Sequence, residues 1–172
     1  HEIGLDKVNV LDIGTGSGCV AISIANYCKN AGVTSIDISE VALSVAKENA
    51  ELNRIKVDFK KYDIMAEIPK GNFDIIVSNP PYIPTDVIKT LDCNVKDYEP
   101  EIALDGGADG LDFYRTIVDN FKRSLADGGF MLYGSMALSM IGMIILFYHK
   151  QQKGRIYIAI IHYIGEEAGD NV

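Results

Sequence analysis

Cysteine and histidine are both scarce in this sequence of 172 residues. The three cysteines, Cys19, Cys28 and Cys93, form no CxxC pair and are odd in number. They therefore predict neither a disulfide framework nor a zinc site. The three histidines lie far apart and show no ligand spacing. We expect no metal centre, and we expect a protein of the reducing cytoplasm.

Basic charge is also in short supply. The chain has 16 Lys and Arg against 24 Asp and Glu, which gives a formal net charge of −8. A surface that grips nucleic acid needs clustered Lys and Arg to displace counterions from phosphates. We therefore expect no direct nucleic-acid partner, and the simplest role of the acidic balance is solubility.

The start of the chain has no apolar run, because residues 1–9 are polar and charged, so no signal peptide is expected. Hydrophobic residues make up 48% of the sequence and charged residues 23%. This balance is typical of a globular protein with a buried core. The length suits one domain over residues 1–172.

Charge is missing altogether from residues 128–148. A stretch of this length could span a bilayer. The alternative is a buried fifth strand, Phe130 to Tyr133, followed by a buried helix. Glycines and serines such as Gly134 and Ser139 make the stretch less lipid-like. We favour the buried strand and helix, and we expect no contact with a membrane.

Apolar runs and helical periodicities alternate along the rest of the chain. Short strands are expected at Val8–Ile13, Thr34–Ile38, Val57–Tyr62, Phe73–Ser78 and, near the end, Arg155–Tyr163. Helices are expected after the glycines near residue 18, from Ser39 as N-cap to about Leu52, and from about Leu111 to Leu125. Lys122 and Arg123 would lie in the last turn of the third helix, which Gly128-Gly129 would stop. Residues 85–109 look acidic and irregular.

This alternation predicts an α/β fold with a doubly wound, mostly parallel, Rossmann-like sheet. In such sheets ligands bind beyond the carboxyl ends of the strands. The sequence places Asp12 to Gly14, Asp37, Asp63 and Asn79 at successive strand ends. We therefore expect a binding site at this edge of the sheet.

A glycine-rich turn follows the first strand in the segment Asp12-Ile13-Gly14-Thr15-Gly16-Ser17-Gly18. Glycines let backbone N–H groups approach a ligand with no Cβ in the way. The spacing is GxGxG and not the GxGxxG of dinucleotide enzymes. It suits a ligand with a carboxylate and a nucleoside but no pyrophosphate. Taken alone, the motif leaves a nicotinamide dehydrogenase open as an alternative.

Acidic residues end the second and third strands. Asp37 lies where a carboxylate can accept both hydroxyls of a ribose. Asp63 is placed to accept from the amino group of an adenine, and Ile64 could pack on the ring. The position of Asp37 favours a functional role over that of an ordinary strand-end aspartate. Asp63 and Ile64, taken singly, would more often be surface residues than ligands.

The tetrapeptide Asn79-Pro80-Pro81-Tyr82 directly follows the fourth strand. Two prolines make a rigid, non-helical corner. This corner can hold the Asn79 side-chain oxygen and the Pro80 carbonyl as two fixed acceptors. Two acceptors orient a planar NH₂ group, and the Tyr82 ring can stack on an amide or a base. The corner thus predicts methyl transfer to an amide or amine nitrogen.

With these motifs in place, the chain resembles the HemK/PrmC family of class I methyltransferases, which methylate a glutamine of peptide chain release factors. The resemblance runs from about Val10 to Phe130. It is carried by LDIGTGSG, SIDIS and DIIVSNPPYIP, and then by the run YEP…ALDGG.DGL..YR between Tyr98 and Arg115. The tetrapeptide alone is shared with methyltransferases of adenine and guanine amines, whereas the combination resembles the glutamine-specific family.

The resemblance implies roles for individual residues. The cofactor S-adenosylmethionine would be bound by Asp12, Ile13, Gly14, Thr15, Gly16, Asp37, Asp63, Ile64 and Asn79. The residues Asn79, Pro80, Pro81 and Tyr82 would hold the glutamine amide, with Asn79, Pro80 and Tyr82 in the catalytic roles. The expected partner is a release factor, through the glutamine of its Gly-Gly-Gln loop, and residues 85–109 would shape the docking.

The sequence also departs from the family. The small N-terminal helical domain of the family has no counterpart in these residues, and the likeness fades after Leu132. Two alternatives stay open. One is an amine methyltransferase that acts on a flipped base of DNA or RNA through the same corner. The other is an inactive remnant that binds the cofactor.

Overall fold

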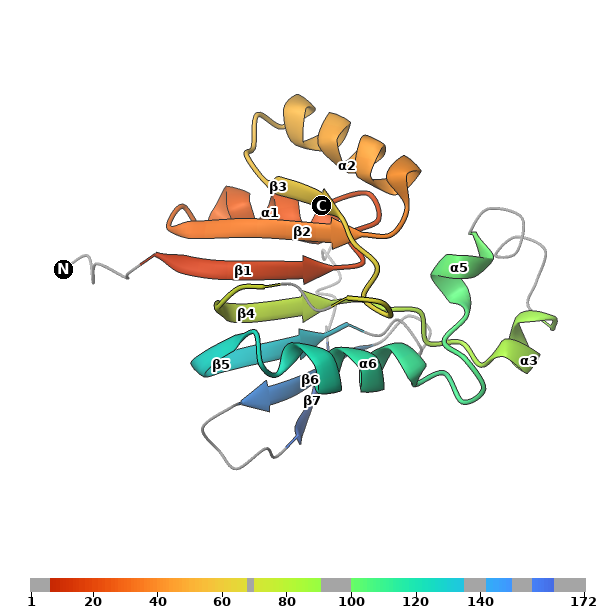
Figure 1. Cartoon of the computed structure of the whole chain (residues 1–172). Helices are drawn as coiled ribbons and strands as arrows, with labels where there is room; N and C mark the ends of the chain where they lie inside the picture. The colour runs from red at the N-terminus through yellow and green to blue at the C-terminus, as the bar shows by residue number, and fades with distance from the viewer. Residues whose placement is uncertain (1–6, 68–69, 91–99, 135–141, 150–155, 163–172) are drawn as a thin grey trace, which may run out of the picture.

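The computed structural model describes residues 7–67, 70–90, 100–134, 142–149 and 156–162. These form a seven-stranded sheet with the order β3-β2-β1-β4-β5-β6-β7 (Figure 1). Strands β3, β2, β1, β4 and β5 are parallel, and β6 and β7 each run antiparallel to the preceding strand. The strands are β1 (Val8–Ile13), β2 (Ala31–Asp37), β3 (Asp58–Lys61), β4 (Phe73–Ser78), β5 (Leu125–Tyr133), β6 (Gly142–His149) and β7 (Ile156–His162).

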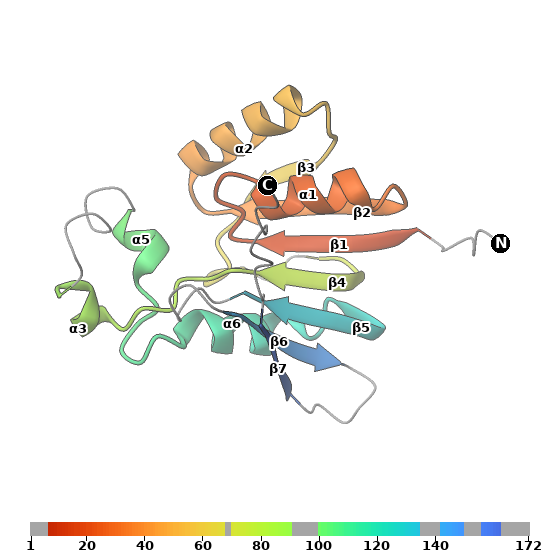
Figure 2. The same ribbon diagram turned by 180° about the vertical axis from the view of Figure 1, so that it is seen from behind.

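The helices cover both faces of this sheet. Helices α1 (Cys19–Tyr27) and α6 (Asp112–Phe121) lie on opposite sides, as Figures 1 and 2 show from front and back. Helix α2 (Glu40–Leu52) contacts β2, β3 and α1. The one-turn helices α3 (Thr85–Ile88) and α5 (Glu101–Leu104) extend beyond the strand ends (Figure 1). The predicted doubly wound, mostly parallel fold is confirmed.

The core is divided in two by the sheet, and β1 contributes to both halves. Val10 packs with Ala21 of α1, whereas Leu11 and Ile13 pack with residues of α6 such as Phe121. Successive side chains of a strand point to opposite faces, so one strand can serve both layers. The central position of β1 explains why its last four residues are all buried, and why all of them except Asp12 are apolar.

The predicted helix from about Leu111 to Leu125 is too long. Helix α6 ends at Phe121, Lys122 and Arg123 follow it, and Leu125 is the first residue of β5. The chain turns because Ser124 N donates to Phe121 O at 2.9 Å and Phe73 N donates to Ser124 O at 2.8 Å.

Gly128 and Gly129 do not stop that helix but lie inside β5. The register against β4 shifts between Phe73 and Ile75 at this point, and Gly128 has a φ of 84°. A Cβ on Gly129 would come within 2.8 Å of Asp74 O. The two glycines therefore form an irregularity that lets β5 follow β4 closely.

The helix predicted after the fifth strand is also wrong where the structure describes it. Residues Gly142–His149 form strand β6, which pairs with β5. The run is rich in β-branched and aromatic residues, and these favour a strand. The expected late strand is confirmed as β7, with its predicted ends outside the described residues. Among the described residues, we find no helix of the length and apolarity needed to cross a bilayer.

Candidate active site

The carboxyl ends of four parallel strands meet at one edge of the sheet. Ile13 of β1 is in register with Ile36 of β2 and Ser78 of β4, and Asp37 is in register with Lys61 of β3. The residues that follow these positions carry the motifs. The structure thus brings Gly14, Asp37, Asp63 and Asn79 to the same edge. The arrowheads of these strands point to that edge, to the right in Figure 1.

The glycine-rich turn is held against β2. Gly14 N and Thr15 N both donate to Ile36 O, at 2.9 and 3.1 Å. Gly14 and Gly16 have φ values of 71° and 55°, a region that L side chains rarely adopt. A Cβ on either glycine would meet nothing within 4 Å, so open space lies beside the turn.

Gly18 has a different role in the same turn. A Cβ at Gly18 would lie 3.0 Å from Ala46 Cβ of α2, so its lack of a side chain permits close packing. Asn49 of α2 adds a second tie, because its Nδ2 donates to Ser17 O at 2.9 Å. Helix α2 therefore fixes the end of the turn where α1 begins.

Asp12 supports the turn from within the protein. Its side chain is 2% exposed, and its Oδ2 accepts from Thr15 Oγ1 at 2.7 Å and from Ser35 Oγ at 3.0 Å. Burial raises the pKa of the Asp12 carboxyl, the two hydroxyls lower it in part, and the charge of Asp37 raises it further. The side chains of Asp12 and Thr15 thus face inward. Ile13 likewise packs in the core, with only its backbone at the edge.

Asp37 links the end of β2 to the glycine turn. Its Oδ2 accepts from Gly16 N at 2.9 Å, and its Oδ1 accepts from Ser39 N at 2.9 Å. The carboxylate is half-buried and has both oxygens directed at backbone N–H groups. It lies at the strand end beside the glycine turn, and its contact with a ribose stays a prediction.

Asp63 and Ile64 occupy a turn after β3. Asp63 Oδ1 accepts from Met65 N at 2.9 Å, and Asp63 O accepts from Ala66 N and Glu67 N. Ile64 is half-buried against the larger core cluster. Asp63 therefore forms a turn, a role that the sequence analysis missed. It remains a candidate adenine ligand.

The corner Asn79–Tyr82 begins directly at the end of β4. Asn79 is exposed, Pro80 is buried, and Pro81 and Tyr82 are half-buried. The last residue of β4 is tied on both sides, because Ser78 Oγ donates to Ile13 O at 2.8 Å and Gly134 N donates to Ser78 O at 2.9 Å. The Asn79 side chain is thus presented at the edge beside the glycine turn.

Two buried serines, Ser35 and Ser78, support this edge in a role that the sequence analysis did not assign to them. Ser35 and Ser78 are 0% and 1% exposed. Gly134 lies beside Asn79, since a Cβ there would come within 3.4 Å of Asn79 Oδ1. The sequence contained a signal for both serines: each lies in a mostly apolar strand, and a hydroxyl that is buried there needs a hydrogen-bond partner.

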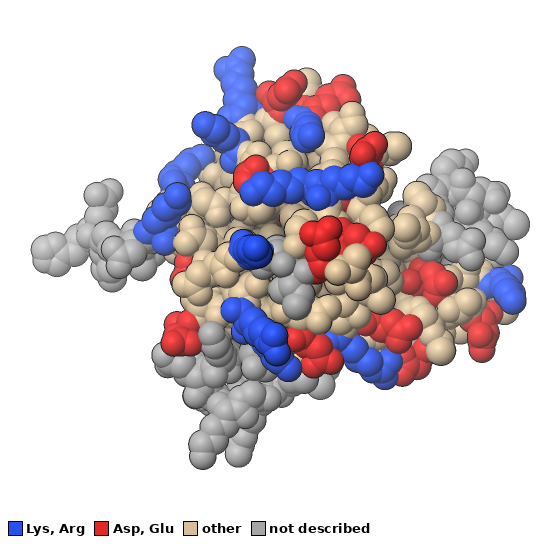
Figure 3. All heavy atoms as spheres, in the orientation of Figure 1, with Lys and Arg blue, Asp and Glu red and all other residues tan. Residues whose placement is uncertain are grey.

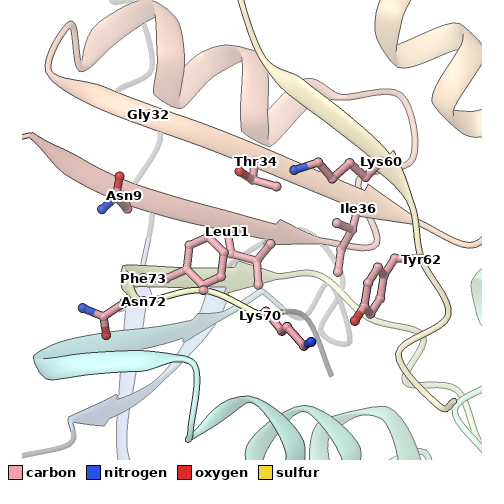
Figure 4. A pocket seen from close by; sticks show the side chains of 11 residues that line it. Asn9, Leu11, Gly32, Thr34, Ile36, Lys60, Tyr62, Lys70, Asn72 and Phe73 are labelled. Atoms are coloured by element: carbon pink, nitrogen blue, oxygen red, sulfur yellow. The ribbon is translucent and has the colours of Figure 1, made fainter. Parts of the chain in front are cut away.

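A pocket of about 370 Å³ lies beside this edge and not within it. It opens on the face of β1, β2 and β3 and is lined by residues that include Leu11, Thr34, Ile36 and Tyr62 (Figure 4). None of the motif residues lines it. Burial, together with the Glu67 carboxylate, raises the pKa of Tyr62. This pocket is therefore separate from the candidate active site.

Acidic side chains gather toward the strand-end side of the face shown in Figure 3, which is the right of that view. Basic side chains lie mainly elsewhere on this face, and several are paired with carboxylates, as in Lys60–Asp58 and Lys61–Glu40. The visible surface near the site is thus a poor match for a phosphate backbone.

Comparison with known proteins identifies the family that this chain matches. Residues 3–91 match the model of the methyltransferase small domain. The chain is 44% identical over 123 residues to the release factor glutamine methyltransferase of Geobacter sulfurreducens, with 72% of this chain and 43% of the relative covered. It is 45% identical over 124 residues to that of Lactococcus lactis, with 72% and 46% covered. The chain therefore spans less than half the length of these curated relatives.

Solved structures support the fold alone. Coclaurine N-methyltransferase, crystallised with N-methylheliamine and SAH, has a TM-score of 0.54 at 17% identity, with 76% of this chain and 31% of that chain covered. YcgJ of Bacillus subtilis has a TM-score of 0.52 at 21% identity, with 77% and 46% covered. The [4+2]-cyclase SpnF scores 0.53 at 19% identity, covering 77% and 40%, so this fold also serves other chemistry.

The glycine turn, the acidic strand ends and the NPPY corner meet at one edge of this sheet, and more than half of the chain matches one family model. The chain belongs to the methyltransferase small domain family.

Proposed function

We propose that this chain transfers a methyl group from S-adenosylmethionine to the side-chain amide nitrogen of a glutamine in peptide chain release factors. The observation that carries the proposal is the position of the Asn79–Tyr82 corner. It adjoins the glycine turn through the direct pairing of β1 with β4. Similarity to curated release factor glutamine methyltransferases supports the choice of substrate. We place the reaction in the cytoplasm, in keeping with the free, exposed thiols of Cys19 and Cys28.

The residues at the edge fit this cofactor. The open space beside Gly14 and Gly16 gives a ligand access to the turn. Asp37 offers carboxylate oxygens for ribose hydroxyls, and Asp63 and Ile64 follow the neighbouring strand, where an adenine would extend. S-adenosylmethionine supplies a methyl carbon bonded to a positively charged sulfur. The role of Asp12 and Thr15 is then to hold the shape of the turn through their mutual hydrogen bond.

The chemistry of the corner follows from its two acceptors. The Asn79 side-chain oxygen and the Pro80 carbonyl oxygen would each accept one N–H of the substrate amide. This arrangement aims the nitrogen lone pair at the methyl carbon. S-adenosylmethionine would supply the methyl group: its C–S bond would break as the new C–N bond forms, and the electron pair of the broken bond would stay on sulfur. The nitrogen would then release one proton to solvent. Positioning and electrostatic stabilisation supply most of such a rate enhancement.

A mass-spectrometric assay tests the proposal. The protein and S-adenosylmethionine are incubated with a release factor, and the loop peptide is searched for one added methyl group. A factor with the loop glutamine replaced by alanine is the control and is expected to stay unmethylated. A short Gly-Gly-Gln peptide at high concentration is assayed in parallel, because this chain spans less than half of its relatives. Methyl incorporation into RNA or DNA, with none into factor or peptide, would refute the amide assignment.

A further inference from the structure

A glycine-rich loop, Leu104–Leu111, lies against the backbone of the corner. We call it the brace loop. A Cβ on Gly106 would come within 2.8 Å of Tyr82 Cα, and a Cβ on Gly110 would collide with the carbonyl oxygen of Tyr82. Gly110 also has a φ of 78°. The backbone of the loop therefore touches Tyr82 so closely that no side chain fits between them.

Backbone hydrogen bonds join the loop to the residues that follow Tyr82. Ile83 N donates to Leu104 O at 3.0 Å, and Gly106 N donates to Ile83 O at 2.9 Å. One further bond runs from Thr85 N to Gly107 O at 3.0 Å. Ile83 and Asp105 thus form a short parallel β-bridge outside the main sheet. It fixes the register of the loop against the corner.

The Asp105 carboxylate links the brace loop to Thr85 through its side chain. Its Oδ1 accepts from Thr85 Oγ1 at 2.7 Å and from Gly107 N at 2.9 Å. The Gly107 N–H, followed by the Thr85 hydroxyl, lowers the pKa of the Asp105 carboxyl. A hydrogen bond that lowers a pKa favours the charged form, so Asp105 joins the two segments as a carboxylate.

The other side of the loop is anchored to the core through α6. Asp112 N donates to Gly106 O at 3.0 Å, and Arg115 pairs with Asp109 at 2.5 Å and with Asp112 at 3.3 Å. Helix α6 itself is fixed by Ile117 and Phe121, both 0% exposed. A continuous set of contacts thus runs from the core, through the brace loop, to Tyr82.

We propose that the brace loop is a positioning element for methyl transfer, which holds the Asn79–Tyr82 corner at the distance that the reaction requires. This inference rests on the proposed function. The residues of the loop act through Tyr82 and Ile83 and do not themselves touch the reacting atoms. A displacement of about 1 Å at such a site can cost roughly 10²-fold in rate, which gives the brace loop a measurable effect on turnover.

Two matched pairs of variants test the proposal. Thr85→Val removes the hydroxyl that Asp105 accepts, and Thr85→Ser keeps it. Gly110→Ala pushes on Tyr82 O, whereas Gly128→Ala places a side chain at a similar φ of 84° in β5, away from the corner. Thr85→Val should lower kcat about 10-fold and Gly110→Ala about 10²-fold. Thr85→Ser and Gly128→Ala should stay within about twofold of wild type.

The affinity for S-adenosylmethionine separates positioning from loss of fold. Calorimetry should give the same Kd, within about twofold, for all four variants, because the hydrogen bonds described for the glycine turn and Asp37 join them to β2 and α2 and not to the brace loop. A fall in kcat with unchanged Kd for the cofactor supports the proposal. Equal kcat for Thr85→Val and Thr85→Ser, or a Kd that weakens in step with kcat, overturns it.

Amide hydrogen exchange tests the brace loop independently of the substrate. The N–H groups of Ile83 and Gly106 should exchange slowly in the wild type and faster in Thr85→Val and Gly110→Ala. Unchanged exchange at both amides overturns the inference. If wild-type protein methylates no release factor or peptide, the proposed function fails, and the exchange data alone decide whether the loop holds the corner.

Discussion

Asp37 has each carboxylate oxygen directed at a backbone N–H, one in the glycine turn and one at the start of α2. Replacement by alanine removes the proposed ribose acceptor and the support of Gly16 together. Asp37→Ala should therefore weaken binding of S-adenosylmethionine by roughly 1.5–3 kcal/mol, as expected for a charge-assisted contact. Calorimetry measures this. Asp58→Ala, at an exposed aspartate paired with Lys60, is the control, and equal affinity for both variants would refute the ribose role.

Asn79 is exposed at the edge, and the surrounding backbone holds its position. In the proposed reaction its oxygen would contribute most when the substrate nitrogen begins to change shape. Asn79→Ala should therefore lower kcat by about 10²–10³-fold with an unchanged melting temperature. The measurement is methyl transfer to the release factor or peptide. Asn26→Ala, at an exposed position of α1, should keep wild-type turnover, and an Asn79→Ala protein that does the same would make Asn79 only a turn residue.

Asp12 predicts a pH dependence of stability. Burial raises its pKa in the folded protein, so the folded state holds this proton more tightly than the unfolded state does. Its contribution to the free energy of unfolding therefore falls as pH rises from the unfolded value through the folded one, by at most about 1.4 kcal/mol per pH unit. Urea denaturation of wild type and Asp12→Asn between about pH 4 and 7 should show the wild type losing stability relative to the variant. A constant difference would contradict the prediction.

Among the elements, α2 was the most predictable. Ser39 Oγ accepts from Ala42 N at 3.2 Å and caps the helix, which ends at Leu52 as the sequence suggested. Ser39→Ala should lower the free energy of unfolding by about 1 kcal/mol, the usual value of such a cap. Ser44→Ala, at an exposed position inside the same helix, should have no such effect in urea denaturation. A loss of equal size in both variants would show that Ser39 is not a cap.

Other elements depended on contacts that a local pattern does not contain. Gly128 and Gly129 are typical of a helix stop, yet they lie inside β5, where Gly129 leaves room for Asp74 O of the neighbouring strand. The start of β2 at Ala31, earlier than the expected Thr34, follows from its register with Val8 of β1. Strand β6 replaces an expected helix because an apolar run of this length fits both, and pairing with β5 decides the outcome.

The candidate site also has some features that the sequence predicted and others that it did not. Its strand-end positions could be predicted, because parallel strands share one edge. The inward direction of Asp12 and Thr15, the turn at Asp63 and the contact of the brace loop with Tyr82 could not. Each of these depends on a partner remote in sequence or on the exact path of a turn. The sequence therefore predicted where the candidate residues lie in the fold. It did not predict which of them support the site through contacts within the protein.

At the scale of the whole molecule, net charge bears on whether the substrate is a protein amide or a base of nucleic acid. The net charge is −8, and acidic groups gather near the strand-end side in Figure 3. Fluorescence anisotropy with a labelled single-stranded RNA at physiological salt should show binding no tighter than the non-specific range of about 10⁻⁴–10⁻⁶ M. A release-factor loop peptide serves as the comparison. Nanomolar RNA binding with a steep salt dependence would instead favour a base-methylating enzyme.

The central pairing of β1 with β4 also bears on how activity arises during folding. Ser78 Oγ reaches Ile13 O across a separation of 65 residues, so the two halves of the site are neighbours only after a long segment of chain has closed. Pairings of such high contact order form slowly. A slip of one residue in this register would turn the side chains of a whole strand to the opposite face. The glycine turn and Asp37 lie together once β1 and β2 pair, but the corner joins them only when β4 pairs with β1. Methyl-transfer competence should therefore appear in a refolding experiment together with the native sheet.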